Sequence, residues 1–166
     1  MQDRPRAQLL ILDNDQGIVE LAAWFLERKG YAVRTAKSFE EARARCAEAW
    51  PDLLLSDLDL GLESGAEELP KLSAAGRLPP TLIVSGYLDA ELAERLCALP
   101  EVLGTLVKPF DLPVLEERLE ECLARAARAT PPDRSRAPAR APEPEPLEDG
   151  DGWIEIRPFD PSSGMR

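Results

Sequence analysis

Five short apolar runs alternate with five segments of helical periodicity over the first three quarters of the chain. The runs are Gln8–Leu12, Tyr31–Thr35, Leu53–Ser56, Thr81–Val84 and Val102–Val107. An unbroken apolar run such as Leu53–Leu55 is typical of a strand that is buried on both faces, as in a parallel sheet. Strict alternation of strands and helices predicts an α/β fold, with a doubly wound five-stranded parallel sheet and helices on both of its faces.

The intervening segments carry recognisable helix-start signals. Helices are predicted at about 17–29, 39–49, 66–75, 89–99 and 111–127. Ser38 followed by Glu41 matches a capping box, and Asp89 and Asp111 are predicted N-caps of the last two helices. Pro70 lies in the third helix, so that helix either starts near this proline or is kinked by it.

The composition changes after residue 127, and this change divides the chain. Residues 128–166 contain half of the chain's 16 prolines, mixed charges and few apolar side chains. We therefore expect one domain over 1–127 and a disordered, Pro-rich tail over 128–166. Within the tail, residues 153–159 (WIEIRPF) alternate like a strand. This segment is either an idle terminus or a motif that adds a strand to an exposed sheet edge.

Charge and residue usage exclude several classes of protein. The chain has 20 Lys and Arg against 31 Asp and Glu, a net charge of −11, which argues against nucleic-acid binding. No apolar run is long enough to span a bilayer and no secretory signal is visible, so we expect a cytoplasmic protein with no membrane contact. Cys46, Cys97 and Cys122 are predicted to be free thiols, and the absence of histidine excludes a histidine phosphocarrier.

Polar residues follow four of the five predicted strands. They are Asp13-Asn14-Asp15, Asp57 with Asp59, Ser85, and Lys108. The carboxyl ends of parallel strands share one edge of a sheet, where α/β folds bind ligands. Gathered carboxylates favour Mg²⁺, whereas a lysine and a hydroxyl bind phosphate oxygens. These are the groups needed for phosphoryl transfer to an aspartate.

With these motifs the sequence resembles the receiver domain of two-component response regulators, over about residues 7–127. LLILDND matches the first strand of that family with its acidic cluster, and PDLLLSD matches the phosphoacceptor strand. LIVSG and VKPF match the ends of the fourth and fifth strands. Each motif alone is weak, but all four occur in order. The resemblance implies a flavodoxin-like fold and phosphorylation on aspartate.

The resemblance also implies a role for each matching residue. Asp57 would be the phosphorylated nucleophile, Ser85 would bind a phosphoryl oxygen in the active state, and Lys108 would pair with the phosphoryl group. Mg²⁺ would be held by Asp57, by Asp13 through water, by Asn14 directly and by the backbone carbonyl of Asp59. The bond between Lys108 and Pro109 would be cis.

Three positions depart from the pattern of the family. Asn14 replaces the usual second acid, which removes one negative charge and predicts weaker Mg²⁺ binding, although Asp15 is a further acid in the same loop. Gly61 replaces a common proline. Thr105 replaces the usual switching Tyr or Phe, which argues against the family's usual coupling of phosphorylation to the face formed by the fourth helix, fifth strand and fifth helix.

Three functions are compatible with these residues. The first is a stand-alone receiver that takes a phosphoryl group from a histidine kinase or phosphotransfer protein and signals by contact with a downstream protein. It would have no turnover beyond self-phosphorylation and autodephosphorylation at Asp57. The second is a degenerate receiver that binds proteins without phosphorylation. The third is a phosphatase of the haloacid-dehalogenase type, which would place its nucleophile on the first strand.

Overall fold

A computed structural model describes residues 4–129, in which five strands and five helices alternate. The strands are β1 (Gln8–Leu12), β2 (Ala32–Ala36), β3 (Leu53–Ser56), β4 (Thr81–Ser85) and β5 (Val102–Val107). The helices are α1 (Gln16–Arg28), α2 (Phe39–Glu48), α3 (Gly65–Ala74), α4 (Ala90–Cys97) and α5 (Leu112–Arg128). The predicted tail, with its apolar segment 153–159, lies outside the described residues.

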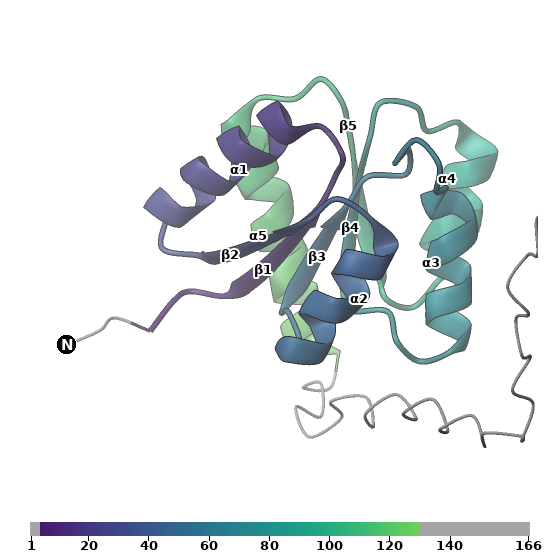
Figure 1. Cartoon of the computed structure of the whole chain (residues 1–166), viewed down its shortest axis with the longest axis horizontal. Coiled ribbons are helices and arrows are strands. Elements are labelled where there is room, and N and C mark those ends of the chain that lie inside the picture. Colours follow the sequence, from purple (N-terminus) through teal and green to yellow (C-terminus); the bar gives the residue numbers. More distant parts are fainter. Residues whose placement is uncertain (1–3, 130–166) are drawn as a thin grey trace, which may run out of the picture.

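All five strands are parallel and form one sheet in the order β2-β1-β3-β4-β5 (Figure 1). The chain first winds outward from β1 to β2, then crosses to β3 and continues in the other direction. This order is that of flavodoxin-like folds, and it creates a switch point between β1 and β3, where such folds bind ligands. The predicted fold class is confirmed.

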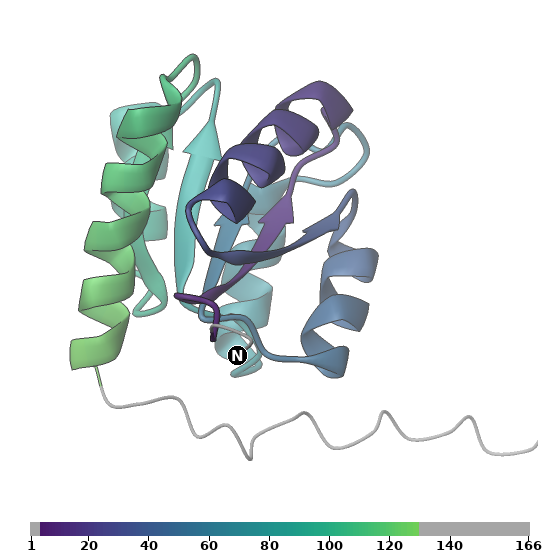
Figure 2. The ribbon, with the colours of Figure 1, turned by 90° about the vertical axis from the view of Figure 1, so that its left-hand side faces the viewer.

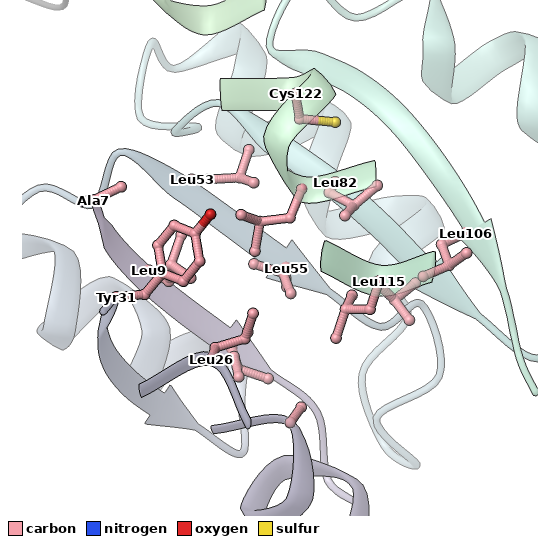
Figure 3. Packing of buried hydrophobic residues seen from close by; sticks show 14 residues of the cluster. Ala7, Leu9, Leu26, Tyr31, Leu53, Leu55, Leu82, Leu106, Leu115 and Cys122 are labelled. Atoms are coloured by element: carbon pink, nitrogen blue, oxygen red, sulfur yellow. The ribbon is translucent and has the colours of Figure 1, made fainter. Parts of the chain in front are cut away.

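Helices cover both faces of the sheet, with α1 and α5 on one face and α2, α3 and α4 on the other (Figure 2). Strand β3 supplies both layers of the core, because Leu53 and Leu55 point to the α1–α5 side (Figure 3), whereas Leu54 belongs to the cluster on the opposite side. Each of these leucines is buried, which stabilises the fold by about 1.5–3 kcal/mol per side chain. None of the described helices combines the length and apolar character needed to cross a membrane.

Two of the predicted helix caps are confirmed. The Ser38 hydroxyl accepts a hydrogen bond from the Glu41 amide at 3.1 Å, although the Glu41 carboxylate accepts from the Lys37 amide and not from that of Ser38. The Asp89 carboxylate accepts from the Leu92 amide at 2.7 Å. These side chains satisfy amides that the first turn of a helix leaves unpaired.

The other two helix-start signals have mixed outcomes. Asp111 occupies the N-cap position of α5, but its side chain accepts no capping hydrogen bond. Pro113, the second residue of this helix, has no N–H and so removes one of the two amides that such a cap bonds. In α3 the helix begins at Gly65, which places Pro70 in the second turn and excludes a start at the proline.

Candidate functional site

Asp57 lies directly after the central strand β3 and is only 7% exposed. Its amide donates to the carbonyl of Leu12 at 2.8 Å, which continues the pairing of β3 with β1. Its Oδ1 accepts hydrogen bonds from the amides of Leu58 at 2.6 Å and Asp59 at 3.3 Å. The backbone therefore orients this carboxylate and leaves Oδ2 for another partner.

Lys108 is that partner, and it joins Asp57 to Asp13. The Nζ atom of Lys108 lies 3.0 Å from Asp57 Oδ2 and 2.5 Å from Asp13 Oδ2. Burial alone would lower the pKa of this ammonium, but its hydrogen bonds to Asp13 and Asp57 and the charges of both carboxylates raise the pKa above its ordinary value. Lys108 is therefore charged at neutral pH. Its bond to Pro109 is cis, as the resemblance implied.

Ser85 ends β4 and is buried beside the same edge of the sheet. Its hydroxyl donates to the carbonyl of Tyr87 at 2.9 Å and accepts from the Tyr87 amide at 3.3 Å. The hydroxyl is thus engaged with the loop that follows β4. It must exchange the Tyr87 carbonyl for a phosphoryl oxygen if it is to donate to one.

Asn14 and Asp59 are exposed on the two loops beside Asp57. The Asp59 carboxylate accepts from the Gly61 amide at 3.0 Å, and a Cβ atom on Gly61 would lie 3.7 Å from the amide nitrogen of Asn14. Gly61 has a φ of +79°, whereas proline is restricted to a φ near −65°. The loop therefore has a conformation at Gly61 that the proline usual in the family could not adopt.

These residues line one open cleft of about 670 Å³, which contains all six predicted site residues. Its walls also include several residues that sequence reasoning did not assign to the site. They are Ile18, Leu58, Ser64, Ala66, Gly86, Tyr87 and Leu92, whereas Asp15 and Gly61 were already placed at this edge but given no role. Tyr87 could have been assigned to the site from the sequence, because it lies two residues after Ser85 in the loop that follows a strand. Asp15 is the N-cap of α1, where its carboxylate accepts from the Ile18 amide at 3.2 Å.

The donor groups around the cleft fit a cation that keeps part of its water shell. Among the described residues, no group of three or more acidic, histidine or cysteine side chains is arranged to hold a metal ion. Two carboxylates, Asp13 and Asp57, are available, and the amide oxygen of Asn14 and the carbonyl of Asp59 are further oxygen donors in the loops. Mg²⁺ commonly binds through one or two carboxylates, with water and substrate phosphates completing its shell.

The three cysteines are free thiols, as predicted, and none of them lines the cleft. Cys97 is exposed and Cys122 is buried. Burial raises the pKa of the Cys46 thiol to about 11, so little reactive thiolate forms there at neutral pH.

The position of Asp57 argues against the phosphatase alternative. Enzymes of the haloacid-dehalogenase type would carry the nucleophile on the first strand, whereas Asp57 follows the third strand along the chain. Two strands, β1 and β2, precede β3 in the chain, so Asp57 cannot follow a first strand.

Comparison with known proteins gives a consistent picture. Residues 9–120 match the family described as the response regulator receiver domain. The transcriptional regulatory protein ZraR of Salmonella typhimurium is 32% identical over 122 residues, which are 73% of this chain and 27% of that protein. The alkaline phosphatase synthesis transcriptional regulatory protein PhoP of Bacillus subtilis is 30% identical over 124 residues, 75% of this chain and 51% of that protein.

Solved structures show the same architecture. NtrX from Brucella abortus has a TM-score of 0.66 at 25% identity, covering 74% of this chain and 28% of that one. The chemotaxis response regulator CheY4 of Vibrio cholerae has a TM-score of 0.62 at 26% identity, covering 70% of this chain and 98% of that one. The chain therefore spans only about a quarter to a half of the curated relatives named above, but it matches nearly the whole of CheY4.

Proposed function

Because the chain belongs to the response regulator receiver family, we propose that it accepts a phosphoryl group on Asp57 from a histidine kinase or phosphotransfer protein. The observation that carries this proposal is the pairing of a buried carboxylate with a charged lysine at the floor of an open cleft. Asp57 Oδ2 lies 3.0 Å from Lys108 Nζ, while the backbone amides of Leu58 and Asp59 hold Oδ1.

The transfer needs few protein groups. A carboxylate oxygen of Asp57 attacks phosphorus as the phosphorus–nitrogen bond of the donor phosphohistidine breaks, and the imidazole leaves with the bonding electrons and takes up a proton. Lys108 offsets negative charge on the phosphoryl oxygens, and the Ser85 hydroxyl donates to one of them once it releases Tyr87.

Mg²⁺ would be held by Asp13, Asp57, the amide oxygen of Asn14 and the carbonyl of Asp59. When bound, it would supply further positive charge for the phosphoryl oxygens. Asp13 is already oriented for such a role, because its Oδ1 accepts from the Asp15 amide at 2.8 Å.

We propose a protein, and not a nucleic acid, as the downstream partner of this receiver, which would act in the cytoplasm. The net charge of −11 supports this choice, since a surface that binds DNA is basic. The curated relatives are transcriptional regulators, of which this chain matches only a part. Their activities are therefore not transferred to it.

A degenerate receiver that binds proteins without phosphorylation is the second candidate. Asn14 favours it, because the loop after β1 offers one carboxylate fewer to a cation than is usual in the family. Thr105 favours it too, because this half-buried residue lacks the aromatic ring that commonly reports the phosphorylated state.

Incubation with acetyl phosphate and Mg²⁺, followed by intact-mass measurement, tests the proposal. The wild-type chain should gain one phosphoryl group, and Asp57→Asn should gain none, because an amide is not a nucleophile here. Asp111→Asn is the matched control, since this aspartate lies outside the cleft and caps nothing. Absence of phosphate from the wild type would favour the degenerate receiver, and phosphate on Asp57→Asn would identify a different acceptor.

A further inference from the structure

Strand β5 forms an edge of the sheet, and no strand among residues 4–129 pairs with its outer side. The amide of Lys108 donates to the carbonyl of Ser85 at 2.9 Å, so the backbone groups of Gly104, Leu106 and Lys108 face β4. Those of Leu103, Thr105 and Val107 alternate with them and face outward. The outer side of β5 therefore presents a row of backbone donors and acceptors.

One outward group already accepts a hydrogen bond from outside the sheet. The guanidinium of Arg125, in the last turn of α5, donates to the carbonyl of Leu103 at 2.7 Å. The remaining outward groups, on Thr105 and Val107, belong to β-branched residues, and Val107 is 52% exposed.

The sequence of β5 carries no charged residue or proline, and its one protective feature is a register shift at its start, where Leu103 is the extra residue. Exposed edge strands commonly contain charged residues or proline, which discourage pairing with another strand. The run VLGTLV has neither, whereas the opposite edge strand, β2, has the charged Arg34 at its centre. Of the two edges, β5 is thus the one suited to receive a strand.

The chain itself leaves the described part beside this edge. The bond between Arg125 and Leu103 fixes the last turn of α5 next to the start of β5, and α5 ends at Arg128. A flexible coil as long as residues 130–152 would span roughly 25 Å. A strand as long as β5 measures about 20 Å, so the connection is long enough for the apolar segment 153–157 to lie along it.

The two surfaces also complement one another chemically. The segment Trp153 to Arg157 alternates, with Ile154 and Ile156 on one side, and it follows the acid-rich stretch 143–151. Arg125 and Arg128, both exposed, are the basic residues of the last turn of α5 beside the start of β5. A tethered segment acts at millimolar effective concentration, so even weak strand pairing is populated.

We propose that residues 153–157 of the tail add a strand to the outer edge of β5. The amides of Thr105 and Val107 would then donate to the tail, and the added strand would cover the exposed side of Val107. This intramolecular strand would compete with any partner that uses the same edge, so the tail would regulate access to it.

Hydrogen–deuterium exchange followed by NMR on the full chain tests this proposal without any phosphodonor. In the double variant Ile154→Pro, Glu155→Pro, the amides of Thr105 and Val107 should exchange at least about tenfold faster than in the wild type, because several hydrogen bonds are lost. The amide of Leu106, which faces β4, serves as the internal reference. Leu147→Pro, Glu148→Pro is the matched control, because it removes the same kinds of side chain from the connecting stretch.

Each outcome decides the matter. Equal exchange at Thr105 and Val107 in the wild type and the double variant would overturn the proposal. Protection that rises with protein concentration would overturn it as well, since a second copy of the chain would then cover the edge. If the control variant speeds exchange at Thr105 and Val107 to the same extent, then the segment 153–157 is not what covers the edge of β5. None of these results bears on phosphorylation of Asp57.

Discussion

At the scale of single residues, two nearly buried carboxylates share one ammonium. Asp13 and Asp57 are 4% and 7% exposed, and both bond to Lys108. Buried charges are stable only when they are paired and hydrogen-bonded, and here backbone amides satisfy the second oxygen of each carboxylate. The trio retains one net negative charge, which is available to a cation.

Asn14→Asp should raise the affinity for Mg²⁺. The side chain is exposed, so a unit charge about 4 Å from this doubly charged cation contributes about 2 kcal/mol, which corresponds to a roughly thirtyfold lower dissociation constant. Isothermal titration calorimetry with Mg²⁺ measures this dissociation constant. Gln8→Glu, which adds the same charge at the opposite end of β1, should leave the affinity nearly unchanged. An unchanged or weaker affinity for Asn14→Asp would show that this position does not contact the cation.

At the scale of elements, α3 starts in direct contact with the end of β3. The Gly65 amide donates to the Leu58 carbonyl at 2.7 Å, and Asp59 and Ser64 form a bridge across the intervening loop. A Cβ atom on Gly65 would lie 2.9 Å from the Leu58 Cα and 3.0 Å from the Asp57 carbonyl oxygen. Its φ is not positive, so glycine is needed here for space alone.

Gly65→Ala should therefore lower the free energy of unfolding by about 1–3 kcal/mol, because the buried backbone of Asp57 and Leu58 just after β3 cannot move aside without disturbing its neighbours. Urea denaturation measures the change. Gly86→Ala is the control, since a Cβ atom there meets nothing within 4 Å and the backbone needs no positive φ. Equal stability of the two variants would mean that the start of α3 shifts freely.

At the scale of the whole molecule, an excess of negative charge opposes the compact state. The net charge is −11, and several of the ion pairs among the described residues join two exposed side chains, for example Arg118 with Glu121. Exposed pairs contribute little to stability, whereas self-repulsion acts over the whole surface.

The melting temperature should consequently rise when NaCl is added at low ionic strength, because salt screens this repulsion. Differential scanning calorimetry measures it, and a neutral osmolyte at the same osmolality controls for effects that do not depend on charge. A fall in the melting temperature with salt would show that attractive ion pairs, such as those of Arg6 with Glu116 and Glu120, outweigh the repulsion.

The sequence by itself determined the elements of this protein and the kind of chemistry at their ends. The continuous apolar run of β3 predicted a strand buried on both faces, and Ser38 predicted the start of α2, because both signals are local. The polar residues that follow four of the strands predicted a shared site, because the carboxyl ends of parallel strands lie at the same edge of the sheet. The roles assigned to these residues remain predictions that the variants above test.

Only the tertiary structure decided which atoms meet. Lys108 reaches Asp13 across 95 positions of sequence because the strand order brings the ends of β1 and β5 to one cleft. The bond of Ser85 to Tyr87, the positive φ of Gly61 and the missing cap at Asp111 are likewise set by how each loop turns. Such contacts depend on the packing of neighbours that are distant in sequence, and local residue patterns carry no record of that packing.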